Sequence, residues 1–314
     1  MALLVVGSVA LDSLETPFGR REDVLGGSAS YFSACASFFG PTRVVAVVGE
    51  DFPEAHLGFL AARGIDLDGL ARRPGRTFRW KGRYEFDLNT AHTLDTQLNV
   101  FAQFQPDLPA HYRDSEYVFL GNIDPDLQRA VLDQVRSPRF VGCDTMNFWI
   151  SSKRESLLRT LERVDMLFVN DAEARQLAEE HNVVKAARRI LTFGPRAVVV
   201  KRGEYGALYF SGDEVFAASA VPLASVFDPT GAGDSFAGGF MGYLASRDGS
   251  LDHGTMRRAI VLGSVLASFT VEQFSLDRLR SLSPREIRVR YAEARRLAHF
   301  DDLEADVLLA GTGD

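Results

Sequence analysis

The sequence predicts an α/β fold in which helices cover both faces of a mostly parallel central sheet. Short, almost continuously apolar segments recur along the chain, and amphipathic stretches with a helical period lie between them. Strands that are apolar throughout are typical of parallel sheets, because both of their faces are buried. The six segments expected to form these strands are 3–6, 44–48, 117–120, 140–143, 166–169 and 197–201.

The intervening segments predict helices. In EAHLGFLAARG, for example, Leu57, Leu60 and Ala61 share one helical face, and Gly64 follows as a stop signal. Ligands of such sheets bind beyond the carboxyl ends of the strands, so residues at strand ends are the first candidates for a site. Further helices are expected at 28–39, 125–136, 152–163, 171–180 and 183–193.

One region breaks the alternation of strands and helices. Residues 77–89, TFRWKGRYEFDLN, alternate with a period of two, which indicates a half-buried antiparallel strand pair. Residues 12–25, with a turn at TPFGRRE, are expected to join the same small sheet. We expect its aromatic face to pack on the core or on a dimer partner, or to close over a substrate as a lid. That face holds Phe78, Trp80, Tyr84, Phe86 and Leu88.

Composition and charge limit the classes of function. The chain has 314 residues, of which 46% are hydrophobic and 25% charged, a balance that suits one α/β domain over 1–314 with a β-insertion at about 12–25 and 75–105. The net charge of −7 disfavours a nucleic-acid binder. Cys35 and Cys143 show neither a disulfide framework nor metal-ligand spacing. No segment approaches the roughly 20 apolar residues of a membrane span, so we expect a cytoplasmic protein.

The glycine-rich stretch DPTGAGDSFAGGF, from 228 to 240, carries the strongest chemical signal. Phe236, Phe240 and Leu244 follow with helical spacing, so a helix begins near Asp234. The free N–H groups and the dipole at a helix N-terminus bind anions, and glycine lets a phosphate approach the backbone. An acid at such a site suits phosphoryl transfer, in which it accepts the proton of the attacking hydroxyl. The alternative is that Asp234 only caps a closely packed helix.

This stretch resembles the C-terminal signature of the ribokinase family, the PfkB-type carbohydrate kinases. The resemblance implies a ribokinase-like fold with a small β-sheet lid, and ATP as the phosphate donor. It also implies that Asp234 is the catalytic base and that the backbone of Gly231, Ala232 and Gly233 forms an anion hole. Asp228 matches a position that in several members helps bind an activating monovalent cation such as K⁺.

The resemblance extends over nearly the whole chain. GGSASYFSACASFFG is similar to the N-terminal Gly-Gly signature of the family, which implies that Gly26, Gly27 and Asp12 bind the substrate. VNDAEARQL is similar to the Asn-x-x-Glu motif, which implies that Asn170 and Glu173 organise Mg²⁺. The alternative for this pair is a capping arrangement at the start of a helix.

Two further segments bear on the nucleotide. VVVKRGEYGAL resembles the strand-end segment that approaches ATP, which implies roles for Lys201, Gly203 and Gly206, although Lys201 is also readable as a surface lysine. In 263–279 the chain has Gln-Phe where a Gly-Ala pair is common near the adenine. A second departure is Tyr31, which stands where ribose-binding members usually carry asparagine and which adds bulk and a single hydroxyl.

We therefore expect an ATP-dependent phosphotransferase that acts on a hydroxyl of a small sugar or polyol, with a homodimer contact through the lid as one option. A nucleoside kinase is the alternative, because the aromatic lid residues Phe78, Trp80 and Tyr84 suit a base. A non-catalytic ligand binder is disfavoured, since it has no use for Asp234. A sugar-phosphate kinase would use Arg79, Lys81 or Arg83 for the second phosphate.

Overall fold

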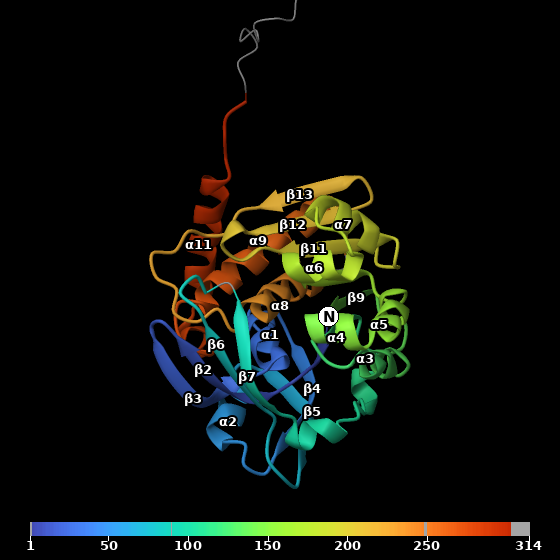
Figure 1. Ribbon diagram of the computed structural model, residues 1–314, viewed down its shortest axis with the longest axis vertical. Coiled ribbons are helices and arrows are strands. Elements are labelled where there is room, and N and C mark those ends of the chain that lie inside the picture. Colours follow the sequence, from blue (N-terminus) through green and yellow to red (C-terminus); the bar gives the residue numbers. More distant parts are fainter. Residues whose placement is uncertain (1, 89, 248–249, 303–314) are drawn as a thin grey trace, which may run out of the picture.

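The main sheet confirms the predicted α/β architecture. The computed structural model describes residues 2–88, 90–247 and 250–302 (Figure 1). Seven neighbouring strands are parallel, and two antiparallel strands extend the sheet at one edge. The spatial order is β13 (Glu214–Ala218), β12 (Ala207–Ser211), β11 (Ala197–Lys201), β10 (Met166–Asn170), β9 (Phe140–Asp144), β8 (Tyr117–Leu120), β1 (Leu3–Val6), β4 (Thr42–Gly49) and β5 (Ile65–Arg73).

Side chains of each strand project alternately to the two faces of this sheet, which explains the continuous apolar segments. In β1, Leu3 and Val5 belong to one buried cluster, whereas Leu4 and Val6 belong to the other. The first cluster includes residues of α1 (Ser28–Ala36), α2 (Glu54–Ala62), α8 (Ala232–Ala245), α9 (His253–Thr270), α10 (Asp277–Ser281) and α11 (Pro284–Leu297). The second includes residues of α3 (Pro125–Leu132), α4 (Asn147–Ser152), α5 (Arg154–Leu161), α6 (Asp171–Ala178) and α7 (Val183–Leu191).

The predicted helices exist, with shorter bounds. The helix expected at 152–163 begins only at Arg154, because Lys153 leaves the helical conformation and Ser152 ends the preceding helix α4. Of the residues that the structure describes, none belongs to a helix long and apolar enough to cross a bilayer.

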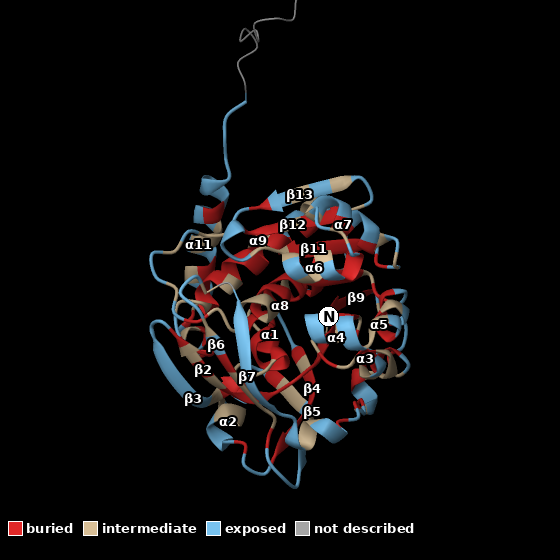
Figure 2. Cartoon of the chain, viewed as in Figure 1, coloured by how far each residue is buried: buried red, intermediate tan, exposed pale blue. Residues whose placement is uncertain are grey.

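A smaller four-stranded sheet, which we call the lid sheet, stands beside the main one. Its order is β3 (Gly19–Gly26), β2 (Ala10–Thr16), β6 (Arg79–Tyr84) and β7 (Ala91–Gln97). The central pair β2 and β6 is parallel, and both outer pairs are antiparallel. Figure 2 shows β3 and β7 as largely exposed strands.

Three aromatic or apolar residues of the predicted lid face do not lie on it. The chain leaves β6 after Tyr84 and turns, so Phe86 is 90% exposed and Leu88 takes a positive φ of 57°. Phe78 precedes the strand and stacks on Phe101 at 5.2 Å. The alternation of apolar and polar residues continues in the sequence beyond the strand. It reflects the polarity of the side chains, which does not determine where the hydrogen bonds of the sheet end.

Candidate functional site

The predicted catalytic segment begins α8. Gly231 precedes the helix with a φ of +74°, and a β-carbon there would lie 2.3 Å from the Tyr31 ring, so the position requires glycine. The first N–H groups of a helix have no partner within it and are free for an anion. One of the predicted donors is already used, because the Ala232 N–H donates to the Pro229 carbonyl at 3.2 Å.

Asp234 lies in the first turn of α8 with its carboxylate in a crowded environment. Burial, followed by the negative charge of Asp144, raises its pKa to about 7, although the Lys201 ammonium acts in the opposite direction. A carboxylate whose pKa lies near neutral pH is both protonated and deprotonated under ordinary conditions, which suits a general base.

Asp144 is a site residue that the sequence analysis missed. It ends β9, and its Oδ2 accepts a hydrogen bond from Lys201 Nζ at 2.9 Å, with both side chains largely buried. Burial opposes the charge of Lys201, but the carboxylates of Asp144 and Glu173 raise the pKa of this lysine. The available signal was an acid directly after the predicted strand 140–143.

The Lys201 side chain extends from the end of β11 towards the start of α8. A β-carbon at Gly233 would lie 3.0 Å from Lys201 Nζ, so the ammonium lies against the bare backbone of the glycine segment. Lys201 is therefore a buried charge next to the helix N-terminus, and the surface alternative is wrong.

Asn170 and Glu173 form the capping arrangement that was the alternative to a metal role. The Asn170 side chain accepts from the Glu173 N–H, and Glu173 Oε2 accepts from the Asn170 N–H, both at 2.8 Å. Burial and the charge of Asp144 raise the pKa of Glu173 to about 7. Because the cap uses only Oε2 of Glu173, the other oxygen remains for Mg²⁺ or its water, and hard oxygen ligands suit this ion.

The residues predicted to bind the substrate lie around Asp12 on β2. A β-carbon at Gly26 would lie 1.9 Å from the Asp12 carboxylate, and one at Gly27, with a φ of +92°, would lie 2.5 Å from the Ser8 carbonyl oxygen. Burial and the charge of Asp228 raise the pKa of Asp12 to about 8, whereas a hydrogen bond from the Gly27 backbone lowers it. Gly26 thus makes room for the buried acid, whereas Gly27 donates a backbone hydrogen bond to it and passes close to the Ser8 backbone.

Asp228 links the signature segment to the loop after α9. Its Oδ1 accepts from the Thr230 N–H and its Oδ2 from the Ser275 N–H, each at 2.9 Å. Burial raises the pKa of Asp228 in spite of these bonds. Each carboxylate oxygen keeps a second lone pair, so the donor set is compatible with a monovalent cation.

The lid sheet brings Tyr84 to the site and places Trp80 on the same face as Asp12. Asp12 and Trp80 are paired in the parallel β2–β6 ladder, so their side chains project from the same face. The Trp80 ring covers Gly82, where a β-carbon would lie 2.1 Å from it, and its Nε1 donates to Thr93 Oγ1 at 3.2 Å. Tyr84 contacts the signature directly, because Thr230 Oγ1 donates to its hydroxyl at 3.2 Å.

Gly203 and Gly206 form the tight turn between β11 and β12. Both have positive φ, and a β-carbon at Gly206 would lie 2.0 Å from the Ala218 carbonyl oxygen. The geometry of this turn by itself requires glycine at position 206, independently of any contact with a nucleotide.

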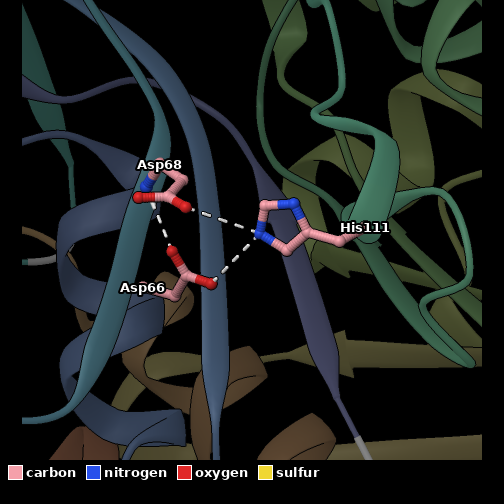
Figure 3. A group of neighbouring side chains, drawn as sticks. All are labelled: Asp66, Asp68 and His111. Atoms are coloured by element: carbon pink, nitrogen blue, oxygen red, sulfur yellow. Dashed lines mark hydrogen bonds and ion pairs between the residues drawn. The ribbon is translucent and has the colours of Figure 1, made fainter.

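A second group of charged side chains lies away from this site. His111 Nε2 is 3.7 Å from Asp66 Oδ2 and 3.6 Å from Asp68 Oδ2 (Figure 3). The Tyr112 hydroxyl also donates to Asp66 at 2.5 Å. Asp66 and Asp68 are near the amino end of β5, whereas Asp144 and Lys201 are at the carboxyl ends of their strands. The two groups therefore lie at opposite ends of the parallel strands.

Comparisons with known proteins point to one family. The family model described as pfkB family carbohydrate kinase matches residues 12–279. A cytidine kinase of Thermococcus kodakarensis is 32% identical over 251 residues, which cover 78% of this chain and 89% of that protein. A nucleoside kinase of Methanothermobacter thermautotrophicus is 27% identical and covers 86% of this chain and 89% of its own length.

A solved structure shows the same fold. The nucleoside kinase of Burkholderia thailandensis, in complex with inosine, superposes with a TM-score of 0.76 at 20% sequence identity, covering 93% of this chain and 98% of that one. The predicted ribokinase-like fold is confirmed by this likeness. The matched family model spans most of the chain, and the chain belongs to the pfkB family of carbohydrate kinases, phosphotransferases that act on sugars or nucleosides.

Proposed function

We propose that the protein is an ATP-dependent nucleoside kinase with Asp234 as its general base. The observation that carries the base assignment is the position of Asp234, in the first turn of α8 beside Lys201 and with a pKa near neutrality. A carboxylate at this place would repel a phosphate, so its presence there calls for a role in proton transfer.

The transfer follows from these positions. Asp234 accepts the proton of the acceptor hydroxyl, whose oxygen forms a bond to the γ-phosphorus of ATP while the bond to the β–γ bridging oxygen breaks. The N–H groups of Gly231 and Gly233 and the positive end of the α8 dipole stabilise charge on the phosphoryl oxygens. Lys201 has two further N–H groups besides the one bonded to Asp144, and since its Nζ lies beside Gly233 they are available to the same oxygens.

Mg²⁺ would be held through Asn170 and Glu173, and when bound it neutralises charge on the phosphates. We assign Gly203 and Gly206 to the ATP side, where their lack of side chains leaves the backbone open to the nucleotide. We also propose that K⁺ binds at Asp228. The rate of ADP release should then fall when K⁺ is replaced by tetramethylammonium at constant ionic strength.

A nucleoside is favoured over a free sugar by one observation of the lid sheet. Trp80 presents a half-buried indole on the face that also carries Asp12, so a substrate whose hydroxyls reach Asp12 brings its remaining part to an aromatic surface. Nucleobases stack on such rings. The similarity to a cytidine kinase supports this reading.

A small sugar or polyol remains the second candidate, since Asp12 and the Gly26–Gly27 loop suit any hydroxyl-bearing substrate. A sugar phosphate is disfavoured, because Arg79 already pairs with Asp23 and Asp51 and projects from the other face of β6.

The test is ADP release with a panel of nucleosides, pentoses, hexoses and inositols, in the wild type and in Asp234→Asn. We expect cytidine or another nucleoside to give the highest kcat/KM, and the variant to lose turnover with every acceptor. A panel in which only free sugars or inositols are phosphorylated overturns the nucleoside assignment.

A further inference from the structure

Gln128 on α3 joins the ends of two neighbouring strands of the main sheet. Its side chain is fully buried, and its Nε2 donates to the Gly121 carbonyl oxygen at 2.9 Å and to the Asp144 carbonyl oxygen at 3.0 Å. Only the nitrogen of the amide can donate to both carbonyls, so these two bonds fix the orientation of the side chain.

The two carbonyls lie where β8 and β9 stop pairing with each other. The last pair of this parallel ladder is Leu120 with Cys143. Gly121 and Asp144 are the next residues of the two segments, and β9 still pairs with β10 at Asp144. Gln128 therefore takes the place of the backbone ladder at the carboxyl end of β9, on the side where the neighbouring strand has ended.

The residue that Gln128 holds by its backbone carries a charged side chain of the site. Asp144 Oδ2 accepts from Lys201 Nζ at 2.9 Å, and Asp144 Oδ1 accepts from the Thr145 N–H at 2.7 Å. Lys201 Nζ in turn lies beside the bare backbone of Gly233 at the start of α8. A series of direct contacts thus leads from α3 to the segment at which the phosphoryl group is transferred.

Catalysis of phosphoryl transfer consists largely of positioning and of stabilising charge. A displacement of about 1 Å in the groups around the reacting atoms can cost about 100-fold in rate. We propose that Gln128 is a positioning residue for this reaction, which ties the Asp144 backbone to β8 and α3 and so keeps the Asp144 carboxylate where it holds Lys201 against the transferred phosphate. The inference rests on the proposed function, which places Lys201 at the phosphoryl oxygens.

A merely structural role is the alternative, and Gln134 provides its control. This half-buried glutamine follows the end of α3, and its Nε2 also donates to two backbone carbonyls, those of Pro106 at 2.6 Å and Ala130 at 3.0 Å. This end of α3 leads into the amino end of β9, away from the site. Gln134→Met should therefore lower the melting temperature and leave kcat unchanged, whereas Gln128→Met should lower both.

The experiment is a double-mutant cycle on kcat between Gln128→Met and Asp144→Ala. Methionine keeps the length of the side chain and removes both donors. We expect Gln128→Met to lower kcat by about 10- to 100-fold and to leave KM for the acceptor near its wild-type value, because Gln128 acts through Asp144. In the Asp144→Ala background the same change should have little further effect on kcat, since the group that it positions is gone.

Gln128→Glu is the second variant if methionine prevents folding. Burial keeps its carboxyl group protonated, so one donor remains for the two carbonyls, and the loss of kcat should be smaller than with methionine. Wild-type kcat in either folded variant, or losses of kcat that multiply in the double variant, overturn the inference.

A failure of the proposed function appears in other measurements. The cycle uses whichever acceptor of the panel is phosphorylated, so a panel that responds only to sugars overturns the nucleoside assignment alone. Near wild-type kcat in Lys201→Met would overturn the proposed transfer geometry and this inference with it. If Lys201→Met is impaired but the cycle shows independent effects, the role of Gln128 fails alone.

Discussion

Replacing Asp144 by asparagine should move the acid limb of the pH–rate profile to lower pH. After burial, the charge of Asp144 is the largest cause of the raised pKa of Asp234. Asparagine keeps the shape at the end of β9 and still accepts a hydrogen bond from Lys201, but it carries no charge. Asp234 then faces the Lys201 ammonium alone, which favours its ionised form.

The structure gives the size of the effect. The pKa of Asp234 is raised from 3.8 to about 7, which corresponds to about 4 kcal/mol of preference for the protonated form. Burial, which asparagine does not change, is the largest single cause of this rise. We expect the loss of one nearby negative charge to lower the pKa by roughly one pH unit, or about 1.4 kcal/mol.

The direction follows from the role of the base. Only ionised Asp234 accepts the proton, so kcat/KM falls as the pH drops through its pKa in the free enzyme. In the variant this fall should begin at a lower pH. The assay is ADP release at saturating Mg²⁺ and ATP, with kcat/KM for the acceptor measured from about pH 5 to 9.

Asp66→Asn is the control for a general change in charge, because Asp66 lies at the opposite end of the parallel strands. The pH–rate profile of this variant should match that of the wild type. An acid limb that stays in place in Asp144→Asn, or moves to higher pH, would refute the coupling between Asp144 and Asp234.

Three further predictions concern single residues of the site. Asp234→Asn should reduce turnover by roughly 10²–10⁴-fold with little change in folding; near wild-type turnover in a folded variant would remove Asp234 from the mechanism. Glu173→Gln should raise the Mg²⁺ concentration that gives the half-maximal rate. If Glu173 only caps α6, the variant should instead lose about 1 kcal/mol of unfolding free energy at unchanged Mg²⁺ dependence. Trp80→Ala should cost about 1–3 kcal/mol in nucleoside binding and much less for free sugars, measured by titration. A change in oligomeric state on a sizing column, with unchanged affinity, would identify this face as a dimer contact instead.

Much of the fold could be predicted from the sequence, because a strand that is buried on both faces of the sheet is a continuous apolar segment. All six predicted strands are present, since β1, β8 and their neighbours are apolar at nearly every position. β5 was not predicted because it is an edge strand of the sheet with many partly exposed residues, so no continuous apolar segment marks it. β12 and β13 are antiparallel at the other edge and were missed as well.

The sequence by itself also determined the kind of chemistry. The segment from Asp228 to Asp234 is continuous, so its glycines, its helix start and its acid could be recognised together. The same holds for Asn170 and Glu173, which are one helical turn apart. Residues this close along the chain are also close in the folded protein, so their sequence spacing is enough to predict that they act together.

Only the tertiary structure decided how these segments meet. Lys201 and Asp144 are 57 residues apart and pair because β9 and β11 end at the same edge of the sheet on either side of β10. The sequence also does not show that the Tyr31 hydroxyl is buried without a partner among the described residues, because this depends on the packing of α1 against the start of α8. Charge, burial and the absence of a partner depend on everything that surrounds a group, and most of those neighbours are distant along the chain.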